Sequence, residues 1–321
     1  MPGNVTREEV ILAYRMFLGR DPENEAVITA GMASWVDLAS MGKAFAVSAE
    51  FGVRHGTNLN ALPPLDAPSN VVETEADAQT LAQMATQLAQ YWTRAGQDAP
   101  HWSVLTEERF LPQNIAANLE AFYAAGTWDA QVLDAILARI GRQASQFAHC
   151  VDYGCGVGRV TLQLARRFAK VTGLDISAPH LHFAAETLRH TGRGNVTLTQ
   201  VMPDNLMPVE ACDLWYSRIV LQHCPPPLTM RILRQAFHAL STGGIAVFQL
   251  PVWSRDYEFR VAPYLEGTPG VEMEMHAIPQ RAILELADFQ GLVLRDVRED
   301  SFLVGRPGAA LSNTFVFEKM R

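Results

Sequence analysis

The sequence predicts an α/β protein with a mostly parallel sheet, and two observations carry this prediction. From residue 147 onward, apolar runs typical of buried strands alternate with stretches of helical periodicity. The first run, 147–151, leads into glycines at positions 154, 156 and 158 and then into an apolar and basic helical run. A strand, a glycine turn and a helix form a place where the backbone can approach a ligand closely.

The later elements follow in order along the chain. Strands are predicted at 169–174, 195–201, 212–217, within the glycine-containing stretch 240–249, and at 291–299 and 313–319. Helices are predicted in the gaps, at 158–168, 178–190 and 226–241. No helix is predicted between the last two strands, so we expect them to form a final hairpin.

The part of the chain before the first strand is predicted to be helical. Thr6 and Glu9 form a capping-box pattern ahead of an apolar helical face that Gly19 can end. A stretch rich in Asn, Pro and Ser then indicates a linker. We expect a small all-α module at 1–55, a linker at 56–73, a helical cap at 74–145 and the sheet domain at 146–321.

Within the cap, three helices are predicted. An amphipathic helix is expected from Glu73 to Ala95. Two shorter helices follow, and we expect the first to end at Gly126 and the second at Gly141, because glycine is common directly after a helix. Helices in this place are expected to cover the site at the sheet.

Composition limits the classes of function. The chain has 321 residues, 48% of them apolar and 19% charged, which is typical of a soluble globular protein. The formal net charge of −8 argues against a strong nucleic-acid binder. No stretch approaches the roughly 18 apolar residues that a membrane span needs, and the N-terminus lacks a signal-peptide pattern. We therefore expect a cytoplasmic protein.

The four cysteines do not indicate a metal site. They show no C-x-x-C pair and no histidine at the spacing that zinc ligands need. We expect four reduced thiols and no bound metal.

The spacing of two acids indicates a nucleoside-containing cofactor. Asp175, at the end of the second strand, lies 23 residues after Asp152. This is close to the roughly 20-residue offset of a carboxylate that binds a ribose diol. The glycines follow G-x-G-x-G, with Arg159 where a G-x-G-x-x-G fingerprint has its last glycine, and no Tyr-x-x-x-Lys pair is present. A nicotinamide-linked oxidoreductase is therefore the weaker alternative.

G-x-G-x-G after an acid, with strands and helices in this order, resembles the class I S-adenosylmethionine (SAM) methyltransferases over about residues 130–321. The resemblance implies a seven-stranded, Rossmann-like sheet and SAM as the cofactor. A second pattern, Leu18-Gly19-Arg20-Asp21-Pro22 with Trp35 and Glu50-Phe51, resembles a small bacterial helical module found beside surface-polysaccharide enzymes. It implies a link to polysaccharide biosynthesis. Docking or oligomerisation through residues 1–55 is the alternative.

The first resemblance implies roles for individual residues toward SAM. The turn would bring its backbone near the amino-acid end of SAM, with Asp152 near the ammonium, Asp175 on the ribose hydroxyls and Asp204 near the adenine amine. The remaining cofactor-binding candidates belong to the turn (Gly154, Cys155, Gly156, Gly158), to the adenine site (Ile176, Met202) and to the methionine side (Ser217, Ile219).

Three residues are candidates for the chemistry. His223 follows the fourth strand, and Glu274 and His276 lie on a loop before the sixth, so all three are expected at the carboxyl ends of the strands. A histidine there is a candidate general base for methyl transfer to a hydroxyl of a small-molecule or glycan-linked acceptor. The alternative from another class is a SAM-binding scaffold without catalytic activity.

Overall fold

The computed structural model describes residues 5–55, 67–267, 270–301 and 310–320. Its contacts divide the chain into two compact units, Met1–Ala67 with Val304–Leu311 and Pro68–Leu303 with Ser312–Arg321. Most of the linker predicted at 56–73 falls outside the described residues. The finer domain boundaries stay a prediction.

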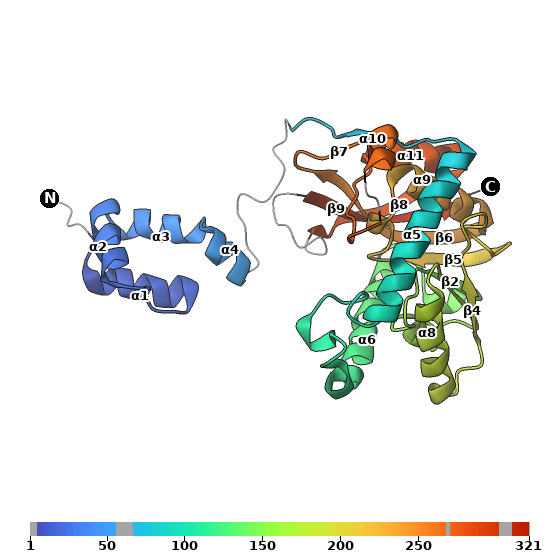
Figure 1. The fold of residues 1–321 in the computed structure, drawn as a ribbon, viewed down its shortest axis with the longest axis horizontal. Helices are drawn as coiled ribbons and strands as arrows, with labels where there is room; N and C mark the ends of the chain where they lie inside the picture. Colours follow the sequence, from blue (N-terminus) through green and yellow to red (C-terminus); the bar gives the residue numbers. More distant parts are fainter. Residues whose placement is uncertain (1–4, 56–66, 268–269, 302–309, 321) are drawn as a thin grey trace. The chain divides into compact units, whose positions relative to one another are not determined.

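The first unit is helical, as Figure 1 shows in blue. The Thr6 hydroxyl accepts from the Glu9 N–H while the Glu9 carboxylate accepts from the Thr6 N–H, so the predicted capping box forms. Gly19 ends the first helix in the left-handed region, with φ 56°. The helices are α1 (Arg7–Leu18), α2 (Glu25–Ser34), α3 (Leu38–Ala46) and α4 (Ala49–His55). Their shared core includes Val10, Leu18, Ile28, Met41 and Phe45.

The second unit contains the predicted seven-stranded sheet. Its strand order is β4-β3-β2-β5-β6-β9-β8. The pairs from β4 through β6 are parallel, whereas β8 and β9 form an antiparallel pair. The strands are β2 (His149–Tyr153), β3 (Lys170–Asp175), β4 (Val196–Gln200), β5 (Cys212–Ser217), β6 (Leu240–Ser254), β8 (Leu292–Glu299) and β9 (Ala310–Lys319). The α/β prediction and the final hairpin are confirmed.

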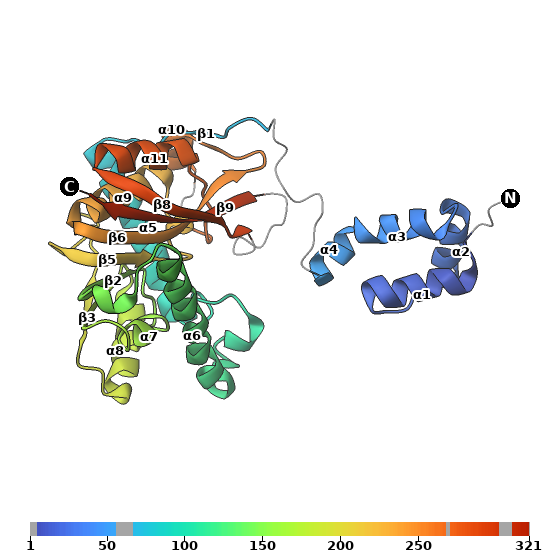
Figure 2. The ribbon, with the colours of Figure 1, turned by 180° about the vertical axis from the view of Figure 1, so that it is seen from behind.

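Helices cover both faces of this sheet. On one face, α6 (Ile115–Arg139) and α7 (Thr161–Leu164) pack through Leu133, Leu137 and Leu164 on a buried core; the two helices lie together in Figure 2. On the other face, Phe237 of α9 (Pro226–Ala239) packs against Phe248, with ring centroids 6.0 Å apart. The remaining elements are α8 (Ala178–Thr191), α10 (Val261–Glu266), α11 (Gln280–Phe289) and a small parallel pair, β1 (Val71–Val72) with β7 (Glu258–Phe259).

Three sequence-based boundaries were wrong. The helix after the glycine turn, predicted at 158–168, is only the short α7. The cap helix predicted from Glu73 is α5, Ala78–Asp98, because the Asp77 carboxylate accepts from the Thr80 N–H and starts it there. The fifth strand, β6, begins directly after α9 and runs on to Ser254, well past the predicted end at residue 249.

Gly126 does not end a helix, so the prediction of two helices was also wrong. The chain runs through Gly126 as a single helix, α6. A Cβ at this glycine would lie 2.3 Å from the Arg159 carbonyl oxygen. Gly126 thus permits close packing of α6 on the backbone after the glycine turn, which is a tertiary reason that local sequence cannot reveal.

Within the described part of the chain, no helix combines the length and the apolar character needed to cross a membrane.

Candidate active site

The glycine turn between β2 and α7 depends on left-handed backbone. Gly154, Gly156 and Gly158 have φ of 76°, 54° and 81°, which residues with a Cβ rarely adopt. A Cβ at Gly154 would lie 2.4 Å from the Val220 side chain, and one at Gly156 would lie 2.8 Å from Val104. The turn is therefore a cradle that any larger residue would fill.

Asp175, at the carboxyl end of β3, holds this turn. One carboxylate oxygen, Oδ2, accepts from the Gly156 N–H at 2.8 Å, and the other, Oδ1, accepts from the Ser177 N–H at 2.8 Å. A carboxylate oxygen can accept more than one hydrogen bond, so both oxygens keep capacity for a pair of hydroxyls. Together with the glycine cradle, this donor and acceptor set fits the ribose and amino-acid parts of SAM.

Asp152 lies deeper, on β2. Its Oδ2 accepts from the Thr161 hydroxyl at 2.6 Å, and burial raises the pKa of its carboxyl to about 6. Two other predicted cofactor residues have buried side chains. The Ser217 hydroxyl donates to the Tyr153 carbonyl at 3.1 Å, and burial raises the pKa of the Cys155 thiol well above its usual value.

The residues predicted for adenine follow the ends of two neighbouring strands. Ile176, directly after β3, is half-buried. Met202 and Asp204, after β4, are exposed, and Met202 forms a tight turn with Asn205 through a pair of backbone hydrogen bonds. Since β3 and β4 are parallel neighbours, these residues share one edge of the sheet. Their role toward adenine stays a prediction.

Ile219, after β5, has an unusual backbone conformation. Its φ is 59°, a strained value for a β-branched residue. Its N–H donates to Gln249 Oε1 at 3.0 Å, and Gln249 also donates to Gln222 Oε1 at 3.0 Å. The buried Gln249 thus fixes the segment that carries Ile219 and His223 beside the glycine turn.

His223 is held at both ring nitrogens. Nδ1 lies 2.7 Å from the Glu274 carbonyl oxygen, which can only accept, so Nδ1 carries the hydrogen. Nε2 then bears the lone pair and lies 3.2 Å from the Gln222 side-chain nitrogen. Burial lowers the pKa of His223 to about 4, so the imidazole is neutral at pH 7.

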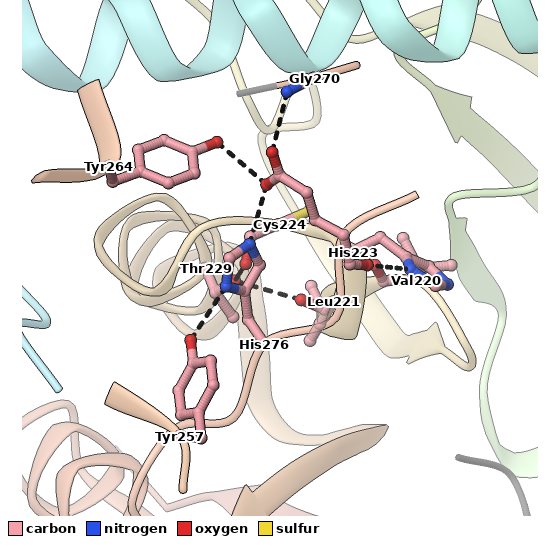
Figure 3. Close-up of polar contacts among 10 residues, drawn as sticks. Val220, Leu221, His223, Cys224, Thr229, Tyr257, Tyr264, Gly270 and His276 are labelled. Atoms are coloured by element: carbon pink, nitrogen blue, oxygen red, sulfur yellow. Dashed lines mark hydrogen bonds and ion pairs between the residues drawn. The ribbon is translucent and has the colours of Figure 1, made fainter. Parts of the chain in front are cut away.

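Glu274 and His276 form a second group, which the Glu274 carbonyl oxygen joins to His223. Figure 3 shows the two histidines with Tyr257, Tyr264 and Gly270. His276 Nε2 lies 2.9 Å from Glu274 Oε2, and its Nδ1 lies 2.9 Å from the Tyr257 hydroxyl. Glu274 also accepts from the Tyr264 hydroxyl at 3.0 Å and the Gly270 N–H at 2.8 Å. Burial acts to raise the pKa of the Glu274 carboxyl, but these hydrogen bonds outweigh it and lower that pKa.

The structure therefore brings together all three residues that the sequence singled out for chemistry. His223 and Glu274 line a small hollow beside α5. His276 does not line this hollow, but its ring contacts the Glu274 carboxylate. The full lining of the hollow is Leu88, Tyr91, Trp92, His223, Tyr264, Gly270, Glu272 and Glu274.

The helix α5 covers this region and was only partly predicted. It crosses the domain in front of the strands in Figure 1 and contacts α8 and α9. The Trp92 ring lies 5.5 Å from the His223 ring and 6.4 Å from the His180 ring. The apolar periodicity of 73–95 indicated a helix, but it did not indicate that Trp92 lies against the candidate base.

A buried ionic cluster beside the site was missed by the sequence reasoning. Asp129 of α6 pairs with Arg159 at 2.6 Å and also with Arg218. The Arg218 guanidinium lies over the Trp128 ring, 4.7 Å from its centroid. Arg159 follows the glycine turn and Arg218 follows β5, so one carboxylate ties both site-forming segments to α6. No local motif marks Asp129.

Residues 150–244 match the methyltransferase domain family. The chain carries a class I SAM-dependent methyltransferase domain. This confirms the family, the fold and the SAM cofactor that the sequence predicts. The link of residues 1–55 to polysaccharide enzymes stays a prediction.

Known proteins resemble this methyltransferase domain over part of their length. A trans-aconitate 2-methyltransferase of Paracidovorax citrulli is 36% identical over 118 residues, which are 36% of this chain and 43% of that one. A carboxy-S-adenosyl-L-methionine synthase of Trichlorobacter lovleyi is 26% identical over 121 residues, 35% of this chain and 50% of that one. The matches thus span half or less of these relatives.

A solved structure supports the fold. The magnesium protoporphyrin IX methyltransferase of Synechocystis PCC 6803 superimposes with a TM-score of 0.50 at 17% identity, covering 73% of this chain and 99% of that one.

Proposed function

We propose that this protein transfers a methyl group from SAM to a hydroxyl of a small-molecule or glycan-linked acceptor. The main observation behind the proposal is that His223 and Glu274 meet at one hollow. The segment that carries His223 also packs on the glycine turn, since a Cβ at Gly154 would lie 2.4 Å from the Val220 side chain. SAM, when bound, supplies a methyl group activated by the sulfonium and keeps the electron pair of the broken S–C bond as S-adenosylhomocysteine.

The chain's own contribution is to place the acceptor and to take up its proton. Positioning of two reactants can supply about 7–11 kcal/mol of barrier lowering. A hydroxyl acceptor must lose its proton as its oxygen bonds to carbon, and a placed base contributes typically about 10²–10⁴-fold. Residues of the glycine turn and Asp175 would hold the cofactor.

Of the two histidines, His223 is the better candidate for the base. Each histidine is hydrogen-bonded at both ring nitrogens. His223 lines the hollow, and the partner of its unprotonated Nε2 is the Gln222 side-chain nitrogen at 3.2 Å. His276 does not line the hollow, and its Nε2 is bound to the Glu274 carboxylate. We therefore assign proton uptake to His223 and a supporting role to His276.

The acceptor of one relative offers a second candidate. Trans-aconitate 2-methyltransferases act on an acid, by their name. Among the described residues that line the hollow, the charged ones are two carboxylates, Glu272 and Glu274. Like charges repel, so this lining favours a neutral or cationic acceptor over trans-aconitate.

Cofactor binding is tested by thermal shift with SAM, S-adenosylhomocysteine and NADH. We expect both SAM compounds to raise the melting temperature, NADH to leave it unchanged, and Asp175→Ala to weaken the response. Asp213→Ala is the matched control, because Asp213 also accepts from two backbone N–H groups, but at the opposite edge of the sheet. A folded protein that does not respond to SAM contradicts the proposal and favours the scaffold alternative.

The base is tested by turnover with a pool of hydroxyl acceptors. We expect His223→Ala to lower kcat by about 10²-fold or more, within the range of general-base effects, while leaving SAM binding intact. His276→Ala is expected to cost less, since it acts through Glu274. If both variants keep the full wild-type rate, neither histidine is the general base.

A further inference from the structure

We propose that the hollow lined by α5, His223 and Glu274 binds an ammonium group, so that the acceptor is an alcohol that also carries a cation. This inference rests on the proposed methyl transfer and adds the class of its substrate. Three features of the hollow support it: aromatic rings, two carboxylates among the lining residues and a fixed arrangement of one of those carboxylates.

Aromatic side chains form much of the wall. Tyr91 and Trp92 come from α5, with their rings 5.3 Å apart and nearly perpendicular, and Tyr264 comes from α10. Aromatic faces attract cations, and alkylated ammonium groups are commonly held in this way. The ring of Trp92 also contacts His223, which places a cation held there near the candidate base.

The charged side chains among the lining residues are acids. Of its eight lining residues, Glu272 and Glu274 are the acids, and none is a lysine or an arginine. The imidazole of His223 is neutral at pH 7 because burial lowers its pKa to about 4. Arg94 is the nearby cation on α5, but it is exposed and donates to the Gly270 carbonyl at 2.6 Å.

Glu274 is arranged in advance for a ligand. Its carboxylate accepts from His276, from the Tyr264 hydroxyl and from the Gly270 N–H. These donors fix the side chain in one place, so a cation would meet a carboxylate that loses little freedom on binding. The side chain keeps 21% of its surface exposed, and it lines the hollow.

The position of the hollow relates the cation to the reaction. His223 and Glu274 share its wall, so an acceptor with its ammonium group against Glu274 would bring a nearby hydroxyl toward the His223 ring. An amino alcohol or an amino sugar has this arrangement of groups. A dicarboxylate or tricarboxylate does not, because it would place anions against Glu272 and Glu274.

The test compares choline with its uncharged isostere, 3,3-dimethylbutan-1-ol, by calorimetric titration of the full chain saturated with S-adenosylhomocysteine. We expect choline to bind at least about 10-fold more tightly than the isostere, within the range of a desolvated cation–π contact. Citrate, the anionic probe, is expected not to bind at this site and not to compete with choline.

Two variants test which carboxylate causes the preference for choline. Glu274→Gln should remove most of the preference for choline, and Glu272→Gln, at an exposed position, should weaken choline binding by about 2–3-fold, as expected for a more solvated charge. Glu210→Gln is the control, since Glu210 is exposed and precedes β5 at the opposite edge of the sheet. If Glu274→Gln does not fold, Glu272→Gln still carries the comparison.

The outcomes separate this inference from the proposed function. Equal binding of choline and its isostere, tighter binding of citrate, or an unchanged preference in both acidic variants overturns the ammonium site while SAM chemistry stands. Failure of S-adenosylhomocysteine to bind the wild-type chain instead overturns the proposed function itself.

Discussion

Burial shifts the pKa of two ionisable side chains at the site in favour of their neutral forms. Burial raises the pKa of Asp152 to about 6 and lowers that of His223 to about 4. The unfolded chain ionises each group more readily, so each of them reduces the stability of the folded state over part of the pH range. Ionisable residues that lower the stability of the folded state in this way are common at functional sites.

Asp152→Asn is predicted to stabilise the protein, and more so at higher pH. Between about pH 4 and pH 6 the folded chain keeps a proton on Asp152 that the unfolded chain has lost, so wild-type stability falls across this window and then stays level. The asparagine has no such dependence. Removing a shift of about two units is worth on the order of 3 kcal/mol. Denaturant unfolding at pH 4.5 and 7.5 measures the difference.

The control for this prediction is Asp98→Asn, at an exposed position at the end of α5. It is expected to change stability little at either pH. An identical effect of Asp152→Asn at both pH values would show that folding does not raise the pKa of the Asp152 carboxyl.

At the scale of elements, the cap helices α6 and α5 contact the segments that form the site. In α6, Gly126 packs closely on the backbone of Arg159. The same helix carries Asp129, which pairs with Arg159 and Arg218. α5 places Trp92 on His223, and a Cβ at its Gly96 would lie 2.7 Å from the His180 side chain. The helices before the sheet therefore form part of the site.

Gly126→Ala is predicted to destabilise the sheet-containing unit and to weaken SAM binding. The new methyl group would lie 2.3 Å from the Arg159 carbonyl oxygen, a backbone atom that cannot turn away. Overpacking of this kind typically costs about 1–3 kcal/mol. It would also displace the turn that Arg159 follows. Thermal unfolding and SAM titration measure both effects.

Gly194→Ala serves as the comparison in the same unit, because a Cβ there would meet nothing within 4 Å. It is expected to change stability by no more than about 0.5 kcal/mol. If the two alanine variants behave alike, close packing of α6 on Arg159 is not what the glycine permits.

At the scale of the whole molecule, the chain consists of two units with separate cores. The helices of the first unit bury Val10, Ile28 and Phe45 among themselves. The second unit holds the sheet, the glycine turn and every residue that lines the hollow. Compact units with their own cores can fold independently.

Removal of residues 1–67 is predicted to leave the fold and SAM binding intact. The measurements are circular dichroism and SAM titration of the shortened chain, with an affinity expected within about twofold of the full chain. Docking or oligomerisation through residues 1–55 is one of the two interpretations of this module, and on that interpretation activity in cells is expected to fall. Loss of SAM binding would contradict independent units.

Features carried by local sequence were predictable. The period of the apolar residues gave the strands of the sheet, and the conformational freedom of Gly154, Gly156 and Gly158 identified the turn, because backbone sterics act within a few residues. The place of Asp175 at a strand end followed from the same pattern. These features determined the fold class and the cofactor.

The tertiary structure decided what depends on contacts between distant segments. Only packing shows that Gly126 lies inside a helix, that Ile219 has a left-handed φ held by Gln249, and that Glu274 meets His223. Each involves groups far apart in the sequence, whose approach reflects the shape of the core rather than a local preference. The chain alone thus indicated methyl transfer, and the class of acceptor that we propose depends on the folded hollow.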